Sequence, residues 1–137
     1  MTSSSAEMHA GAFQAIQRAL RVSGTELRPP RPDVAARLLP LAWHVPLRMF
    51  YELCDGMERY AYHDASEICL WGTAYLDVRP AYVDFADFLI DSHTYALLPP
   101  GHVALMDGVR PHARVARSVY EFLERMAHDP ERLFAGA

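Results

Sequence analysis

Several residue types are absent or scarce in this chain of 137 residues, and each absence narrows the functions to consider. Lysine and asparagine do not occur, so all 13 basic residues are arginines, scattered along a chain with a net charge of -4. Because no basic stripe forms, binding to nucleic acid or to an anionic membrane surface is not expected. A mildly acidic surface suits a basic partner better.

Cysteine is scarce, and glycine clusters and long apolar runs are absent. Cys54 and Cys69 stand in apolar surroundings without the spacing of a zinc site, so they are predicted to be buried free thiols. The seven glycines are isolated, which excludes a glycine-rich phosphate loop. The seven histidines are dispersed, and no metal or cofactor is expected. With no signal segment and no run long enough to span a membrane, the expected location is the cytoplasm.

The stretch YVDFADFLIDSHTYALL, from Tyr82 to Leu98, is the most informative part of the chain. It predicts two strands, 83–90 and 94–98, joined by a turn at residues 91–93. Aromatic and aliphatic residues occupy both faces of the first strand, so it is predicted to lie at the centre of a sheet. Such a strand must be covered on both sides, and the helical segments near the chain ends are available to cover it.

Flanking patterns predict the remaining elements. Phe13, Ile16 and Leu20 recur at helical spacing, and Pro46 opens a second helix that ends near Leu53. Asp33 is a plausible N-cap for a short turn over residues 34–39. Further strands are predicted over 68–71, 74–78 and 102–106, the last ending at the Asp107-Gly108 turn. A final amphipathic helix has one apolar face, made by Val115, Val119, Phe122, Leu123 and Met126.

This order of elements predicts an α+β fold. A single antiparallel or mixed sheet of four to six strands is expected, with helices from both termini packed against it. The Ser-rich residues 1–5 are predicted to form a disordered tail, and residues 6–137 a single domain.

Two aspartates and a histidine are the main candidates for chemistry. Asp87, Asp91 and His93 could converge at the end of the central hairpin, where they would suit acid/base work or a divalent ion. The competing reading is that Asp91 and His93 are ordinary turn residues. Asp87 interrupts an apolar strand, so if buried it needs a partner, for which Arg114 and Arg117 are candidates.

Three segments, taken together, resemble a known family. They are VPLRMFYELCDG (Val45–Gly56), FADFLIDSHTYAL, and the closing VARSVYEFLERMAHDPERLF. Their order and spacing are similar to the SUKH superfamily, which includes the yeast cell-wall assembly regulator and many small bacterial proteins. The resemblance spans roughly residues 34–134. It implies a noncatalytic α+β domain, and for bacterial members an immunity role in which a toxin is bound and neutralised.

The loop between the helical part and the sheet is the predicted contact region. Aromatic rings with polar tips are enriched at interfaces, and acidic side chains would attract a basic partner such as a toxin domain. The predicted partner-binding residues are Glu58, Tyr60, Tyr62, His63, Asp64 and Glu67. The expected protein is a monomer or weak homodimer that occludes its partner. Two alternatives stay open: a small hydrolase or metal-dependent enzyme using Asp87, Asp91 and His93, and a ligand-sensing or assembly module with an apolar cleft near Trp71 and Tyr75.

Overall fold

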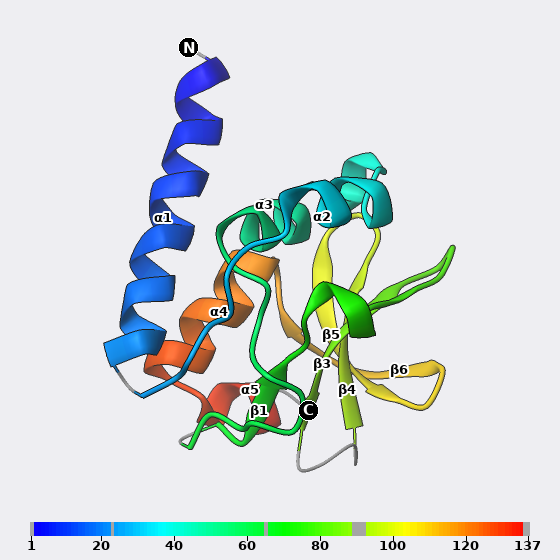
Figure 1. Cartoon of the computed structure of the whole chain (residues 1–137). Coiled ribbons are helices and arrows are strands. Elements are labelled where there is room, and N and C mark those ends of the chain that lie inside the picture. Colours follow the sequence, from blue (N-terminus) through cyan, green and yellow to red (C-terminus); the bar gives the residue numbers. More distant parts are fainter. Residues whose placement is uncertain (1, 23, 65, 89–92, 136–137) are drawn as a thin grey trace.

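The computed structural model describes residues 2–22, 24–64, 66–88 and 93–135 (Figure 1). Its helices are α1 Thr2–Val22, α2 Pro32–Leu38, α3 Val45–Leu53, α4 Val119–His128 and α5 Glu131–Ala135, with single 3-10 turns η1 Ala42–His44 and η2 Thr73–Tyr75. Its strands are β1 Ile68–Leu70, β2 Asp77–Val78, β3 Val83–Phe88, β4 His93–Leu98, β5 His102–Asp107 and β6 Arg110–Ala116.

The strands form one antiparallel sheet, which confirms the predicted α+β class. Within the described residues it has six strands in the order β1-β3-β4-β5-β6, and β2 pairs with β3 as well. The central position predicted for β3 is confirmed, because it pairs with β1, β2 and β4. A register shift between Asp84 and Ala86 interrupts the β3–β4 ladder. Such a bulge changes which face of the sheet the following side chains point to.

Helices α1, α3 and α4 lie together on one side of the sheet (Figure 1). The main core lies between them and the strands. Phe122 of α4 is fully buried, with its ring centroid 5.3 Å from that of Phe85 on β3 and 4.9 Å from that of Tyr95 on β4. These tilted and edge-on contacts add to the area that the rings bury. Helices from both ends of the chain therefore pack against the sheet as the sequence predicts, but they lie on one side of it, so the expectation that helices cover both faces of the central strand is wrong.

Helix α1 begins earlier than the composition suggests. It starts at Thr2, so the structure places residues 2–5 in a helix where a disordered tail is predicted. Alanine-rich sequence directly follows the serines, and helical propensity extends backwards through them. Further along, the helix has the buried face that its spacing predicts, made by Phe13, Ile16 and Leu20. The centroid of the Phe13 ring lies 6.0 Å from that of Tyr120 on α4.

The carboxy-terminal part corrects the sequence-based prediction. Val115 belongs to β6 and not to the last helix, which begins at Val119 after the N-cap Ser118. The Ser118 side chain accepts a hydrogen bond from the backbone of Glu121. Strand β6 escaped prediction because its first residues, RPHAR, are polar and mostly exposed, so no apolar pattern marks it.

Two smaller differences concern helix and strand boundaries. Helix α2 begins at Pro32 with Arg31 as N-cap, so Asp33 lies inside the helix instead of capping it. The predicted strand 74–78 is a 3-10 turn followed by the short β2. Cys54 and Cys69 are buried and free, as predicted. Among the described residues, no helix has both the length and the apolarity needed to cross a membrane.

Candidate functional site

The predicted contact region, residues 57–67, connects α3 to the sheet and is called loop 57–67 below; residue 65 lies outside the described residues. Two backbone hydrogen bonds fix it beside β1. The Met57 N–H donates to the Leu70 carbonyl at 2.7 Å, and the His63 N–H donates to the Ile68 carbonyl at 3.0 Å. The loop is therefore held at both ends by the edge of the sheet.

The entry to the loop requires a glycine. Gly56 has a φ of 69°, and a Cβ placed there would lie 2.5 Å from the carbonyl oxygen of Trp71. No other residue fits so close to the backbone of the neighbouring segment. The preceding Asp55 is buried, and its carboxylate accepts a hydrogen bond from the Thr73 N–H at 2.9 Å. These contacts set the direction in which the loop leaves α3.

A buried carboxylate holds the loop against the central strand. Asp87 of β3 is 0% exposed. It accepts hydrogen bonds from the Arg59 guanidinium at 3.0 Å, from the Trp71 indole N–H at 2.6 Å, and from the Tyr62 hydroxyl. Three donors around one carboxylate compensate for its loss of water. Asp87 thus ties Arg59 and Tyr62 of the loop to the sheet.

Three aromatic rings surround Arg59, and together with it they are called the arginine cluster. The guanidinium carbon lies 4.5 Å from the ring centroid of Tyr60, 4.9 Å from that of Trp71 and 5.6 Å from that of Tyr75. All three distances are within the range of cation–π attraction. Tyr60 is 59% exposed and Tyr75 is 50% exposed. The cluster consequently presents two large rings to solvent on a fixed base.

Tyr60 also carries unusual backbone geometry. Its φ of 68° lies in the left-handed region, which costs a residue with a Cβ about 1 kcal/mol. The surrounding contacts hold this conformation, because Arg59 on one side and Tyr62 on the other are both bonded to Asp87. The geometry directs the Tyr60 ring outward over Arg59.

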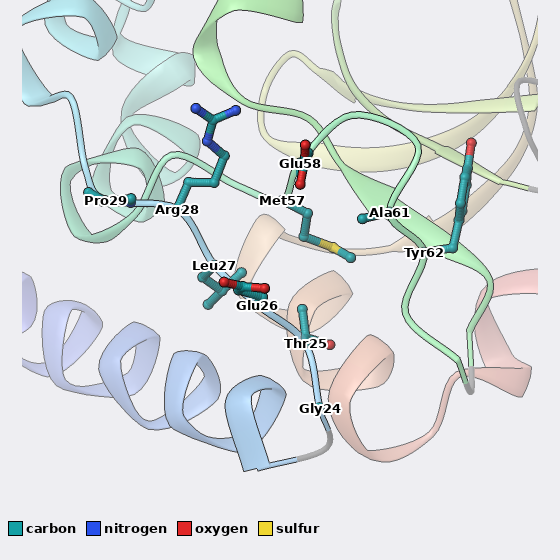
Figure 2. A pocket seen from close by; sticks show the side chains of 10 residues that line it. All are labelled: Gly24, Thr25, Glu26, Leu27, Arg28, Pro29, Met57, Glu58, Ala61 and Tyr62. Atoms are coloured by element: carbon teal, nitrogen blue, oxygen red, sulfur yellow. The ribbon is translucent and has the colours of Figure 1, made fainter.

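A pocket of about 520 Å³ lies between loop 57–67 and the connector that joins α1 to α2 (Figure 2). Residues 24–29 of that connector supply one wall, and Met57, Glu58, Ala61 and Tyr62 of the loop supply the other. Backbone hydrogen bonds join the two walls, since Arg28 donates to the Gly56 carbonyl and accepts from the Asp55 N–H. The pocket is therefore formed by segments that are bonded to each other.

Comparisons of the chain with protein-family models, curated proteins and solved structures found no match. The functional argument therefore rests on the chain's own residues.

The six predicted contact residues fall into four groups. Glu58 and Tyr62 line the pocket, and Tyr60 belongs to the arginine cluster. Asp64 and Glu67 are exposed. His63 lies below the surface, where its Nδ1 is 2.7 Å from the Ser66 hydroxyl. Burial lowers the pKa of His63, with a smaller opposing effect from Asp64.

The structure also places the residues considered for chemistry. Asp87 is the base of the arginine cluster, and Asp91 lies outside the described residues. His93 is half-buried on β4, opposite Phe88. An arginine pairs with Asp87, as predicted, but it is Arg59. The predicted candidate Arg117 pairs with Glu121 instead. Among the described residues, no group of three His, Cys, Asp or Glu side chains is arranged to hold a metal ion.

The burial of a further carboxylate, that of Asp84, was not predicted from the sequence. Asp84 of β3 lies directly opposite Asp77 of β2 and accepts a hydrogen bond from the Thr94 hydroxyl at 3.1 Å. Burial raises the pKa of Asp84 to about 6, and the nearby Asp77 charge acts in the same direction. Both Asp84 and Asp87 interrupt the apolar strand, but the sequence pattern does not show that the bulge between them brings both into buried positions.

Proposed function

We propose that this chain is a noncatalytic protein-binding module that docks through loop 57–67 and the arginine cluster. The single observation that carries the proposal is the exposure of Tyr60 and Tyr75 on a base fixed by buried Asp87. Tyrosine, tryptophan and arginine are the residue types that contribute most to binding energy at protein interfaces. Rings that are already held in place lose little conformational entropy when a partner covers them.

The charge around the loop supports a basic partner. Glu58, Asp64 and Glu67 are all exposed. Their charges would attract a positively charged surface and raise the association rate, an effect that added salt screens. An immunity-type or regulatory role, in which the module covers the active site of a toxin domain, accords with the resemblance to the SUKH superfamily.

The arrangement of Asp87 supports a binding role over a catalytic one. A general base or a metal ligand needs access to the reacting group. Asp87 has no exposed surface and is surrounded by three donors, so a substrate would first have to displace Arg59 or Tyr62. The charged Arg59 guanidinium likewise lies 4.9 Å from the Trp71 ring centroid and 5.6 Å from that of Tyr75, where a sensing module would need an apolar cleft.

The product of the gene next to the one encoding this chain is the partner to test first, because toxins and their immunity proteins are typically encoded side by side. The association rate of the two proteins would be measured at low and high salt, with one of them immobilised on a sensor surface. We expect a one-to-one complex whose association rate falls severalfold as salt rises. A neighbour that shows no binding at micromolar concentration, or a complex that leaves the toxin fully active, would count against the proposal.

Tyr60→Ala tests whether the arginine cluster is the contact surface. Removing an exposed interface tyrosine is expected to weaken binding about tenfold or more while leaving the folded stability nearly unchanged. Val109→Ala is the control, because Val109 is 64% exposed in the turn between β5 and β6 and belongs neither to loop 57–67 nor to the arginine cluster. If both variants bound the partner with equal affinity, the arginine cluster would not be the contact surface.

A further inference from the structure

We infer that Asp84 and Asp77, which face each other across strands β3 and β2, form a pH-dependent switch that controls how firmly Tyr75 is held in the arginine cluster. The inference rests on the proposed function, because Tyr75 is one of the two exposed rings of that surface, and it adds a way of regulating the surface. Protonated Asp84 keeps β2 attached to β3, and ionised Asp84 loosens the attachment.

Strand β2 has few attachments to the rest of the sheet. It consists of the two residues Asp77 and Val78, and both pair with β3. Just after it, the Arg79 N–H donates to the Tyr82 carbonyl at 2.9 Å. Among the described strands, β3 is the one partner of β2. Because so few hydrogen bonds fasten β2, one unfavourable cross-strand pair can shift its local opening.

The two carboxylates lie on the same face of the sheet, because residues directly opposite in an antiparallel pair point the same way. Asp84 is 7% exposed, and among the described residues its hydrogen-bond donor is the Thr94 hydroxyl at 3.1 Å. Asp87 of the same strand has three donors. A buried carboxylate with a single neutral donor is poorly compensated when it is charged.

The charged groups around Asp84 come from β2 and the turn after it. Asp77 opposes its ionisation, and Arg79 favours ionisation more weakly. Arg79 is itself engaged, because it lies 3.0 Å from the Asp77 carboxylate and 5.6 Å from the Tyr82 ring centroid. From β4, the neutral Thr94 hydroxyl faces Asp84. Burial, opposed by the Thr94 hydrogen bond and aided by the Asp77 charge, raises the pKa of Asp84 to about 6.

Strand β2 continues directly from the segment that carries Tyr75. Tyr75 is the last residue of η2, and Leu76 alone separates it from β2. The other end of η2 is held where the Thr73 N–H donates to the Asp55 carboxylate at 2.9 Å. Because the Tyr75 ring is 50% exposed, its position over Arg59 depends on the backbone at both ends of η2. When β2 loosens, one of these two ends is released.

The direction of the switch follows from these contacts. Below about pH 6, Asp84 is protonated, β2 is fastened and Tyr75 is held. Above that pH, two carboxylates face each other across the strands and the hold on Tyr75 weakens. Tyr60 is not part of the switch, because Asp87 fixes the neighbouring Arg59 through a separate bond. The contact surface is accordingly better ordered in mild acid than at alkaline pH.

The test is amide hydrogen exchange and two-dimensional NMR of the intact free chain between about pH 5 and pH 8, corrected for the intrinsic pH dependence of exchange. We expect the protection of the Arg79 amide to fall about twofold to fivefold as pH rises, the range set by one cross-strand pair. The ring signals of Tyr75, observed with labelled tyrosine, should change with the same midpoint. Unchanged protection of Arg79, or Tyr75 signals that do not follow the titration of Asp84, would overturn the inference.

Three variants identify the group that titrates. Asp84→Asn keeps the shape and removes the titration, so the Arg79 protection and the Tyr75 signals should be constant across the same pH range. Asp77→Asn removes the facing charge and should move the midpoint to lower pH. Asp107→Asn is the matched control, an exposed aspartate at the end of β5, and should behave like the wild type. If Asp84→Asn retained the wild-type pH dependence, Asp84 would not be the switch.

The switch can be tested without a partner, because every one of these measurements is made on the free chain. A neighbouring gene product that fails to bind would count against the proposed function alone. A complex that forms while Tyr75 shows no pH dependence would overturn only the switch.

Discussion

The two sides of strand β3 are stabilised in different ways. On the side of α4, Phe85 packs against Phe122 in an apolar core. On the side of loop 57–67, Asp87 accepts hydrogen bonds from Arg59 and Tyr62 of the loop and from the buried Trp71 indole. The hydrophobic driving force is nondirectional, whereas charge-assisted hydrogen bonds to a carboxylate depend on direction and fix the positions of the donors. The comparison indicates that the helical side maintains the fold and the loop side maintains the shape of a surface.

Phe122→Ala would break the helical side and has the largest expected effect. The ring is fully buried between Phe85 and Tyr95, so its loss should lower the free energy of unfolding by about 3 to 5 kcal/mol. Urea denaturation followed by circular dichroism measures the change, with Val109→Ala as the exposed control. A loss below about 1 kcal/mol would mean that α4 is not docked as described.

Asp87→Ala would break the loop side. It leaves the half-buried Arg59 and the Trp71 indole N–H without the carboxylate, and we expect a loss of about 2 to 4 kcal/mol. Asp87→Asn retains the shape and one acceptor oxygen, so its loss should be smaller. Partner binding should fall in both variants even where the protein stays folded, because Tyr60 is no longer held. Retained binding with an intact fold would contradict the role given to Asp87.

Asp84→Asn sharpens the comparison within the same strand and has the smallest effect. The pKa of Asp84 is about 6 in the folded protein, above its ordinary value of 3.8, so the native state holds this proton more tightly than the unfolded chain. The contribution of Asp84 to the free energy of unfolding of the wild type therefore falls as pH rises from about 4 to 6. Asparagine should raise stability by roughly 1 to 2 kcal/mol at pH 8 and give little gain at pH 4.

Unfolding curves at several pH values would measure that difference. A constant difference between Asp84→Asn and wild type across pH 4 to 8 would show that Asp84 does not titrate as inferred. Asp77→Asn provides a second check, because removing the facing charge should bring the pKa of Asp84 closer to its ordinary value.

The sequence predicts well what local patterns encode. The central β3–β4 hairpin and the helical face of Phe13, Ile16 and Leu20 follow from periodicity, which reflects burial directly. The boundary at Val115 was wrong because its spacing from Val119 and Phe122 fits a helix by coincidence. Ser118, with Glu121 three residues later, was the signal that marks the true start of α4.

Only the local part of the proposed site is visible in the sequence. Aromatic rings with polar tips stand beside acidic side chains in loop 57–67, and this mixture predicts a contact region, which remains a proposal. The pairing of Arg59 with Asp87 spans 28 positions in the sequence, and the pocket joins two segments separated by α2 and α3. Neither the ion pair nor the pocket could be predicted from local sequence patterns, because each brings together segments that are far apart in the sequence.

Gly56 has a consequence for how this surface could change over time. The start of loop 57–67 is fixed by the close approach of the Gly56 backbone to the Trp71 carbonyl, which is possible because glycine has no side chain. Substitutions at exposed positions further along, such as Glu58, Tyr60 or Asp64, leave that anchor intact. A chain built this way can acquire new specificities by varying a few outward residues, while the framework that displays them is inherited unaltered.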